Sequence, residues 1–351
     1  MQERSSVNAE LNSRERVLRL FRGDEIDRIP VFSGLGNVTA DGLKKCGCRF
    51  VDVHSDAHKM ASAAASTFQL YGFECATVPF DFGIEPETLG CEVNFYPHSE
   101  DIIYPTIKRN LAEHIEDVNV DVPSDLAKAG RIPIVAEAIR LLKEEVGKQV
   151  AVGAIILGPY TLAGQVTDPG YMAKMAFKKP DIVCKLLDIL DEVEIETARI
   201  YKEAGADYIT IHEMAAGGDI LSPRMFGSVV RPHLERIIAA IPSPKVLHMC
   251  GDTDGIVDQM AICGADAISV EQKNHIAESR KKVGPDVLIF GNIDTFNLMV
   301  GGKPEDVDSA VKQAIAEGVN AVWPGCDLWP SVPKENMEAL VAATIKYGKL
   351  G

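Results

Sequence analysis

The sequence predicts an α/β protein built on a TIM-type (β/α)8 barrel, and three observations lead to this prediction. The 351 residues are 46% hydrophobic and 25% charged, which is the composition of an ordinary globular protein. Eight short apolar runs are rich in Val, Ile and Ala and are bounded by Gly, Pro or Asp. From residue 200 onward, a longer stretch of helical periodicity follows each run. This alternation is typical of parallel strands joined by right-handed crossovers, and eight strands close a barrel.

The first expected element is an amphipathic helix that starts at Ser13. The Ser13 hydroxyl can cap this helix, and residues such as Val17 and Phe21 supply its apolar face. Residues 1–13 are polar and are expected to form a flexible tail. Tail and helix together would be an N-terminal helical extension of one barrel domain that covers residues 1–351, since such barrels accept insertions.

The eight expected strands lack strict polar alternation, as strands buried on both faces of a parallel sheet do. They are 29–33, 75–80, 150–157, 208–212, 246–250, 267–270, 287–291 and 320–324. The regular helices expected in the second half are 180–204, 222–240, 253–263, 274–283, 303–318 and 334–348. The pattern fits least well between residues 90 and 147. An irregular segment at 94–123 and a helix near 132–146 are expected there, as an insertion between strands two and three.

Charge and apolar content exclude two classes of partner. The net charge is −15, from 51 acidic and 36 basic residues, so nucleic acid is not an expected partner because its binding relies on clustered Lys and Arg. No run reaches the ~20 apolar residues of a membrane span, and the N-terminus has no apolar signal region. We therefore expect a cytoplasmic protein with reduced thiols, and these features allow a homo-oligomer.

Polar, titratable or ligating side chains follow seven of the eight expected strands. This placement matters because TIM-type barrels carry their catalytic groups at the carboxyl ends of the strands. In chain order they are Asp81, Tyr160, His212 with Glu213, His248 with Cys250, Glu271, Asn292 with Asp294, and Cys326. Of these, Asp81, Tyr160, Glu213 and Asn292 are predicted to bind substrate, although Asp81 and Glu213 could equally be hydrogen-bonding residues of the rim.

Three of these residues predict a zinc site. His248 and Cys250 are two positions apart on a strand, so their side chains point to the same face while Met249 points to the other. Cys326 follows the last strand and would enter the same barrel mouth. One imidazole and two thiolates suit Zn²⁺, and three protein ligands leave the open position of a catalytic site. Glu271 is the expected fourth ligand or displaceable guard. The alternative is a buried histidine with two core thiols.

The remaining cysteines and histidines are expected to be structural or solvated. Cys46 and Cys48 are too close in sequence for an easy disulfide, and Cys75, Cys91, Cys184 and Cys263 are expected in the core. Most of the histidines on loops or helix faces are expected in solvent, namely His54, His58, His98, His114, His233 and His275. His212 is either a packed residue or part of the site.

Several segments resemble the uroporphyrinogen decarboxylase superfamily, specifically its methylcobamide:coenzyme M methyltransferase branch. They are 27–31 (DRIPV), 52–60 (DVHSDAHKM), 78–90 (VPFDFGIEPETLG), 157–164 (LGPYTLAG), 246–253 (VLHMCGDT), 291–302 (GNIDTFNLMVGG) and 324–326 (PGC). The resemblance implies a zinc-dependent enzyme of one-carbon metabolism with His248, Cys250 and Cys326 as metal-binding and catalytic residues. The site is also similar to that of cobalamin-independent methionine synthases, which have a ligating Glu where Glu271 lies here.

The resemblance further implies the reaction and its partners. A separate corrinoid protein would supply the methylcobamide, and a small thiol such as coenzyme M would accept the methyl group. Because only a thiolate attacks and a free thiol has a pKa near 8.5, binding of its sulfur to zinc would supply the nucleophile. The thiolate would take the methyl group in line and release Co(I).

Three alternatives remain open at this point. A decarboxylase of the same superfamily keeps an important aspartate where Asp81 lies, but its arginine-rich segment reads VFSGLGN at 31–37 here. The acceptor could instead be homocysteine, since coenzyme M carries a sulfonate and the acidic rim offers no identifiable cation for it. Finally, a non-catalytic barrel could hold a structural zinc or bind a corrinoid protein.

Overall fold

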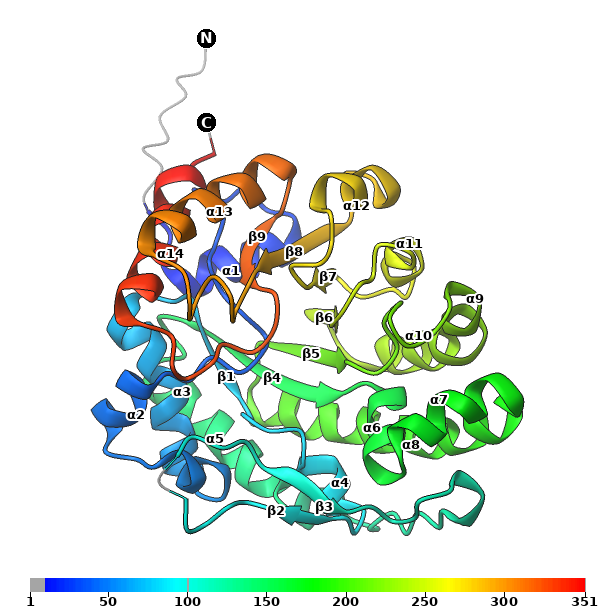
Figure 1. Ribbon diagram of the computed structural model, residues 1–351. Coiled ribbons are helices and arrows are strands. Elements are labelled where there is room, and N and C mark those ends of the chain that lie inside the picture. The colour runs from blue at the N-terminus through cyan, green and yellow to red at the C-terminus, as the bar shows by residue number, and fades with distance from the viewer. Residues whose placement is uncertain (1–9, 100, 351) are drawn as a thin grey trace.

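Seven parallel strands form the main sheet in this computed structural model, which describes residues 10–99 and 101–350. In spatial order they are β1 (Cys75–Val78), β4 (Ala151–Leu157), β5 (Tyr208–Glu213), β6 (Lys245–Met249), β7 (Ala267–Val270), β8 (Leu288–Ile293) and β9 (Ala321–Pro324). Each strand pairs in parallel with the next. The sheet curves and the helices lie around its outside (Figure 1). The prediction of a parallel α/β fold is confirmed.

The first of the eight predicted strands, 29–33, forms only one bridge. Val31 bridges Val322 of β9 in parallel, and the Glu74 N–H, just before β1, donates to the Val31 carbonyl at 2.9 Å. The segment therefore lies between the two edge strands of the sheet. It cannot pair as a regular strand because Pro30 has no N–H and the Val31 N–H donates to the Glu74 side chain at 2.9 Å.

Helices follow the strands in the predicted alternation. They are α1 (Ser13–Arg22), α2 (Ala40–Cys46), α3 (Ala57–Tyr71), α4 (Ile84–Thr88), α5 (Ile132–Glu145), α6 (Pro159–Val166), α7 (Pro169–Lys178), α8 (Pro180–Ala204), α9 (Pro223–Met225), α10 (Arg231–Ala240), α11 (Val257–Ala261), α12 (Ile276–Val283), α13 (Pro304–Glu317) and α14 (Lys334–Tyr347). In the part of the chain that the structure describes, none of them is both long and apolar enough to cross a bilayer.

Three helix predictions need correction. Asn12, and not Ser13, caps α1, because its side chain accepts from the Glu15 N–H at 2.8 Å. The helix expected at 222–240 is interrupted by a π-helical turn (Phe226–Val230), and the one expected at 253–263 shrinks to α11. Of the expected tail at 1–13, residues 1–9 lie outside the described residues.

The insertion between β1 and β4 contains more regular structure than predicted. Within the stretch expected to be irregular, β2 (Glu92–Asn94) and β3 (Thr106–Arg109) form an antiparallel pair. The pair and α4 lie along the lower edge of the molecule in Figure 1. The helix expected at 132–146 is present as α5, and Pro133 in its first turn suits a helix start.

An aromatic cluster fills the inside of the sheet near its amino end. Phe32, Phe290 and Trp323 contribute rings whose centroids lie 4.9–5.3 Å apart. Tyr208 of β5 packs 5.8 Å from Phe32, and Phe21 of α1 contacts Phe32 at 6.0 Å. Because side chains from distant strands meet here, the interior is a packed core and the chemistry is left to the opposite, carboxyl end.

Candidate active site

Two thiols and two imidazoles meet at the carboxyl ends of β5, β6 and β9. The Cys250 Sγ lies 3.7 Å from the Cys326 Sγ, 3.2 Å from the His212 Nε2 and 3.3 Å from the His248 Nε2. We call these four residues the sulfur–imidazole cluster. Of the three residues that the sequence singles out as zinc ligands, Cys250 thus contacts both His248 and Cys326. His212, which the sequence left undecided, is the histidine whose ligand atom lies within 4.8 Å of both sulfurs.

Strand register explains why the cluster forms. His212 of β5 pairs with His248 of β6, so both imidazoles leave the sheet on the same face with ring centroids 4.7 Å apart. Cys250 is two positions beyond His248, and Cys326 follows the end of β9. Parallel strands therefore bring residues that are distant in sequence to one edge.

Both histidines are fully buried and neutral. Burial lowers the pKa of His212 to about 3, and burial together with His212 lowers the pKa of His248 well below its usual value. The two rings differ in how they are held. The His248 Nδ1 lies 2.9 Å from the Ser269 hydroxyl, whereas the His212 Nδ1 has no hydrogen-bond partner among residues 10–99 and 101–350.

The thiol of Cys250 is not ionised by the protein alone. The neighbouring Cys326 sulfur, burial, and the charges of Asp327 and Glu271 raise the pKa of Cys250 well above its usual value. Positive charge placed among these sulfurs would reverse that shift, because a coordinating thiol is deprotonated outright. The cluster thus gathers sulfur and nitrogen lone pairs without a balancing cation from the described residues.

The distances in the cluster fit a tetrahedral metal. Two sulfurs at about 2.3 Å from zinc lie about 3.8 Å apart, and a sulfur and a nitrogen ligand about 3.6 Å apart. The observed Cys250–Cys326 and Cys250–histidine distances are 3.7 Å and 3.2–3.3 Å. One ligand atom each from His212, Cys250 and Cys326 lies within 4.8 Å of the other two. The residues present therefore fit a zinc ion.

Glu271, the expected fourth ligand, lies beside the cluster. Its Oε2 accepts a hydrogen bond from the backbone N–H of Gly251, the residue after Cys250. Gly251 has a φ of +80°, which favours glycine. The carboxylate thus holds the turn that carries Cys250.

A cavity of about 190 Å³ opens next to Cys326. We call it the Cys326 pocket, and its lining residues are Asp81, Phe82, Tyr104, Pro105, Cys326, Asp327 and Trp329. The Phe82 ring packs edge-on against the His212 imidazole at 4.9 Å. The pocket is therefore continuous with the sulfur–imidazole cluster and is the place where a small substrate can meet it.

Asp81, a predicted substrate-binding residue, lines this pocket but is fully engaged by the protein. Its two carboxylate oxygens accept from the Arg131 guanidinium at 2.8 and 2.9 Å, and Oδ2 lies 2.8 Å from the His54 Nδ1. Although burial alone would raise it, the hydrogen bonds of His54 and Arg131 bring the pKa of Asp81 below its usual range. His54 is thus buried and not solvated as expected. His233 is buried too, at 2.8 Å from the Asp191 carboxylate.

Glu213, also predicted to bind substrate, caps the start of α6. Its carboxylate accepts from the N–H groups of Tyr160 at 3.0 Å and Thr161 at 3.3 Å, and also from the Thr161 hydroxyl. A Cβ at Gly158 would lie 2.5 Å from its Oε2, so glycine permits this approach. Burial raises the pKa of Glu213 to about 7 despite these hydrogen bonds. Tyr160 is buried within the same element.

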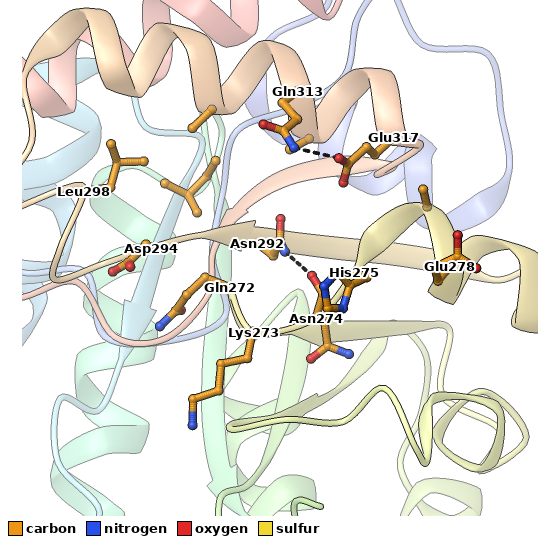
Figure 2. A pocket seen from close by; sticks show the side chains of 14 residues that line it. Gln272, Lys273, Asn274, His275, Glu278, Asn292, Asp294, Leu298, Gln313 and Glu317 are labelled. Atoms are coloured by element: carbon orange, nitrogen blue, oxygen red, sulfur yellow. Dashed lines mark hydrogen bonds between the residues drawn. The ribbon is translucent and has the colours of Figure 1, made fainter.

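Asn292 lies in a different pocket. This larger cavity, about 430 Å³, is lined from β8, α12 and α13, and the Asn292 amide donates to the Asn274 carbonyl at 2.9 Å (Figure 2). It shares no lining residue with the Cys326 pocket. That Asn292 binds substrate stays a prediction.

The structure adds two residues, Tyr104 and Asp327, to the candidate site. Tyr104 lies in the insertion and reaches the Cys326 pocket, and its pKa is raised by burial and by the nearby Asp327 and Cys326. Asp327 accepts from the Gly36 N–H at 2.5 Å. Its position directly after Cys326 was a usable signal, since the loop that carries a ligand also lines the pocket.

Comparisons with known proteins find full-length relatives of the same fold. Residues 12–347 match the family described as uroporphyrinogen decarboxylase (URO-D). The methylcobamide:CoM methyltransferase MtaA of Methanosarcina barkeri is 32% identical over 340 residues, which cover 97% of this chain and 99% of that protein. A solved methyltransferase from Methanosarcina mazei has a TM-score of 0.90 at 30% identity, covering 96% of this chain and 99% of the other. A B12-independent methionine synthase from Shewanella sp. W3-18-1, at 14% identity, TM-score 0.60 and coverage of 91% and 97%, shares the fold.

Proposed function

The chain belongs to the uroporphyrinogen decarboxylase family, and we propose that it transfers a methyl group from a methylated corrinoid to a thiol at a zinc site. It is a methyltransferase, as are its full-length relatives. The observation that carries the zinc proposal is the convergence of one further thiol and two imidazole nitrogens on the Cys250 sulfur, at 3.2–3.7 Å. A small pocket beside Cys326 gives this group access to substrate.

We assign the zinc ligands to Cys250, Cys326 and His248, although the three ligand atoms that lie within 4.8 Å of one another are those of His212, Cys250 and Cys326. A ligating histidine usually gives its other nitrogen to a hydrogen-bond partner, which fixes the tautomer and the ring. His248 has this partner in Ser269 at 2.9 Å, whereas the far nitrogen of His212 has none among the described residues. His212 then serves as an N–H donor to the Cys250 sulfur. Glu271 stays beside the site as the group that can occupy or leave the fourth position.

When bound here, zinc would hold the acceptor sulfur as a thiolate at neutral pH. The chain's residues supply the rest. Cys250 and Cys326 place two negative sulfurs next to the acceptor, which keeps it nucleophilic, and the Cys326 pocket holds its tail. The acceptor sulfur then forms a bond to the methyl carbon while the cobalt–carbon bond breaks, and the electron pair remains on cobalt.

The methylated corrinoid would come from a partner corrinoid protein. Two aromatic side chains at the same end of the sheet support an approach from this side. Phe296 and Trp329, which follow β8 and β9, are 54% and 46% exposed and pack with ring centroids 5.3 Å apart. Trp329 also lines the Cys326 pocket. Exposed aromatic pairs of this size are typical of contact surfaces.

Decarboxylation of a tetrapyrrole is the weaker alternative. That reaction needs cations to bind several substrate carboxylates, and segment 31–37 contains none. Arg28 pairs with Glu74 at 2.9 Å, and Arg131 pairs with Asp81. Neither guanidinium is left to the pocket.

Metal content and methyl transfer test the proposal together. We expect the purified chain to bind one zinc and to demethylate methylcobalamin when a thiol is present. Cys326→Ala should lose both, whereas Cys184→Ala, which removes a half-buried thiol on α8, should lose neither. If Cys326→Ala keeps its zinc and its thiol-dependent rate, the proposal is wrong. His248→Ala and His212→Ala then distinguish the ligand from the donor, because only the first should release zinc.

A further inference from the structure

The larger cavity beside β8, of about 430 Å³, carries three side-chain amides on its walls. They are Gln272, which follows β7, Asn292 of β8 and Gln313 of α13 (Figure 2). We call this space the amide cavity. It has room for about 14 water-sized groups. The amide cavity can therefore hold more than one short polar side chain of a ligand.

Two of these amides have carbonyl oxygens that accept no hydrogen bond from residues 10–99 and 101–350. The Gln272 Oε1 is buried and has no donor. The Asn292 nitrogen donates to the Asn274 carbonyl at 2.9 Å, and the Asn292 oxygen points the other way, toward α13 (Figure 2). A buried acceptor without a donor is costly. These oxygens therefore favour a ligand that brings N–H groups.

The charged side chains of the amide cavity already have partners within the protein. The pairs lie at 2.5–2.9 Å and are Lys273 with Asp219, His275 with Asp254, Glu278 with Lys281, Glu317 with Gln313, and Asp294 with the Phe296 N–H. A charged ligand would have to displace one of these partners. The unpaired amide oxygens instead match an uncharged ligand with N–H donors, and a primary amide is the simplest such group.

The amide cavity lies next to the sulfur–imidazole cluster. Gln272 directly follows Glu271, which lies beside the cluster. A Cβ at Gly325, the residue before Cys326, would lie 3.0 Å from the Gln272 Oε1. Glycine at this position therefore lets the Gln272 amide approach the loop that carries Cys326. A large substrate at the Cys326 sulfur would also lie close to this amide.

The exposed aromatic pair connects the amide cavity with the Cys326 pocket. Asp294 on the cavity wall accepts from the Phe296 N–H at 2.9 Å, and Phe296 packs against Trp329, which lines the Cys326 pocket. A corrinoid is a broad macrocycle with acetamide and propionamide arms around its edge. When its cobalt faces the Cys326 pocket, arms on one side can reach the neighbouring amide cavity.

We propose that the amide cavity binds amide arms of the corrinoid that donates the methyl group, and that the Gln272 and Asn292 oxygens accept hydrogen bonds from these arms. This inference rests on the proposed methyl transfer and adds a recognition site for its donor. It assigns the predicted substrate contact of Asn292 to the corrinoid. Because both residues are neutral amides, the recognition involves no charged group of the protein.

Two corrinoids with different side-chain ends test the proposal on the zinc-loaded full chain. Methylated cobinamide carries amides, whereas methylated heptamethyl cobyrinate carries methyl esters, which accept hydrogen bonds but donate none. Equilibrium dialysis without a thiol gives the Kd of each, and addition of 2-mercaptoethanesulfonate gives each rate of demethylation. We expect the Kd of the amide form to be about tenfold lower, because two ordinary hydrogen bonds have about this effect.

Variants assign the preference to the cavity. Gln272→Leu should raise the Kd of the amide form by about fivefold and leave that of the ester unchanged, while zinc content stays at one per chain. Gln69→Leu removes an exposed amide on α3 that donates to Glu145 at 3.0 Å, and it should change neither Kd. If Gln272→Leu folds poorly, Ala310→Trp provides a second test. A large side chain at this half-buried wall position should fill the cavity and abolish the preference.

The outcomes separate this inference from the proposed function. Equal affinity of the unaltered chain for the two corrinoids would overturn the inference, as would an unchanged preference in both Gln272→Leu and Ala310→Trp. Methyl transfer to the thiol would then remain intact. Failure of both methylated corrinoids to react with the thiol would instead contradict the proposed function, and the dialysis would still decide whether the amide arms bind.

Discussion

The sulfur–imidazole cluster and the Asp81 group lie at the same end of the sheet, are both buried, and differ in how their charge is balanced. Asp81 has Arg131 on both carboxylate oxygens, His54 on one of them and the Gly83 N–H on the other. Cys250 has another thiol and two neutral imidazoles around it. Buried charge is costly unless it is paired. The charge of the Asp81 group is therefore balanced by protein side chains alone, whereas the sulfur–imidazole cluster needs a bound cation to balance the charge of its thiolates.

The largest expected effect comes from Cys250→Ala. The Cys250 sulfur is the atom that contacts every other member of the cluster. Its removal should therefore abolish zinc binding and reduce thiol-dependent demethylation to background. The free energy of unfolding of the metal-free protein should change little, since no other described side chain depends on this sulfur for its charge balance. Zinc content, methylcobalamin absorbance and urea unfolding measure the three quantities. If Cys250→Ala instead strongly lowers the unfolding free energy of the metal-free protein, the cluster contributes to stability without metal, as the Asp81 group does.

Arg131→Met should have the opposite profile. Removing the guanidinium leaves the buried Asp81 carboxylate without its main partner, which is expected to lower the free energy of unfolding by about 3–5 kcal/mol. The double variant with Asp81→Asn should recover part of this loss, because the unpaired charge is gone. Zinc content should stay at one per chain. Should the single variant be as stable as the unaltered protein in urea, Arg131 does not balance the buried Asp81 charge.

Glu85 gives a pH test of buried charge near the same group. Burial raises the pKa of the Glu85 carboxyl to about 7. Burial, and then the charge of Glu85, raise the pKa of Glu194 well above its usual value. An acid whose pKa is raised on folding stabilises the protein at low pH, and this contribution is lost as pH rises through about 7. Glu85→Gln should therefore be more stable than the unaltered chain at pH 8, by about 3 kcal/mol, and equal to it near pH 4.

Asp81 serves as the internal control for this sign. Its pKa is lowered on folding, so its contribution is present above pH ~4 and is lost as pH falls further. Unfolding free energies measured across pH should fall at the acid end in chains that keep Asp81 and less so in Asp81→Asn. Glu85→Gln should remove a loss of stability that occurs as pH rises, and Asp81→Asn should remove a loss that occurs as pH falls. If the unfolding free energy of both variants depends on pH in the same way, the two pKa shifts are assigned wrongly.

Ser269→Ala is expected to have the smallest effect. The Ser269 hydroxyl holds the His248 Nδ1 at 2.9 Å, and loss of such a partner typically weakens metal binding by about 10–100-fold. Competition with a chelator measures this affinity. His212→Phe keeps a ring at the other imidazole and should reduce zinc affinity less. Equal losses in both variants would mean that the two histidines share the ligand role.

The sequence predicts well those parts of the fold whose conformation is determined by residues close together in the sequence. The 25-residue helix α8 starts at Pro180 and ends before Gly205, whose φ is +111°, and β7 coincides with its apolar run. The segment 29–33 was predicted less well because its pairing depends on Pro30 and on the side chain of Glu74, 43 residues after Val31.

The candidate site was predictable where strand geometry alone decides it. His248 and Cys250 share a face by the two-residue period, and Cys326 follows a strand that ends at the same edge. The role of His212 depends on its register with His248, and the role of Tyr104 on the path of the insertion, neither of which a single strand encodes. Asn292 lines the pocket beside α12 and α13, and its predicted contact with substrate stays a prediction.

X-ray absorption at the zinc edge, with and without a thiol, examines the proposed metal site itself. We predict that zinc is coordinated by the sulfurs of Cys250 and Cys326 and by histidine nitrogen, with one further sulfur when 2-mercaptoethanol is added. Cys326→Ser should lower the sulfur count by one in both states. Zinc without sulfur ligands, or a sulfur count that does not rise with the thiol, would show that zinc does not activate the acceptor at this cluster.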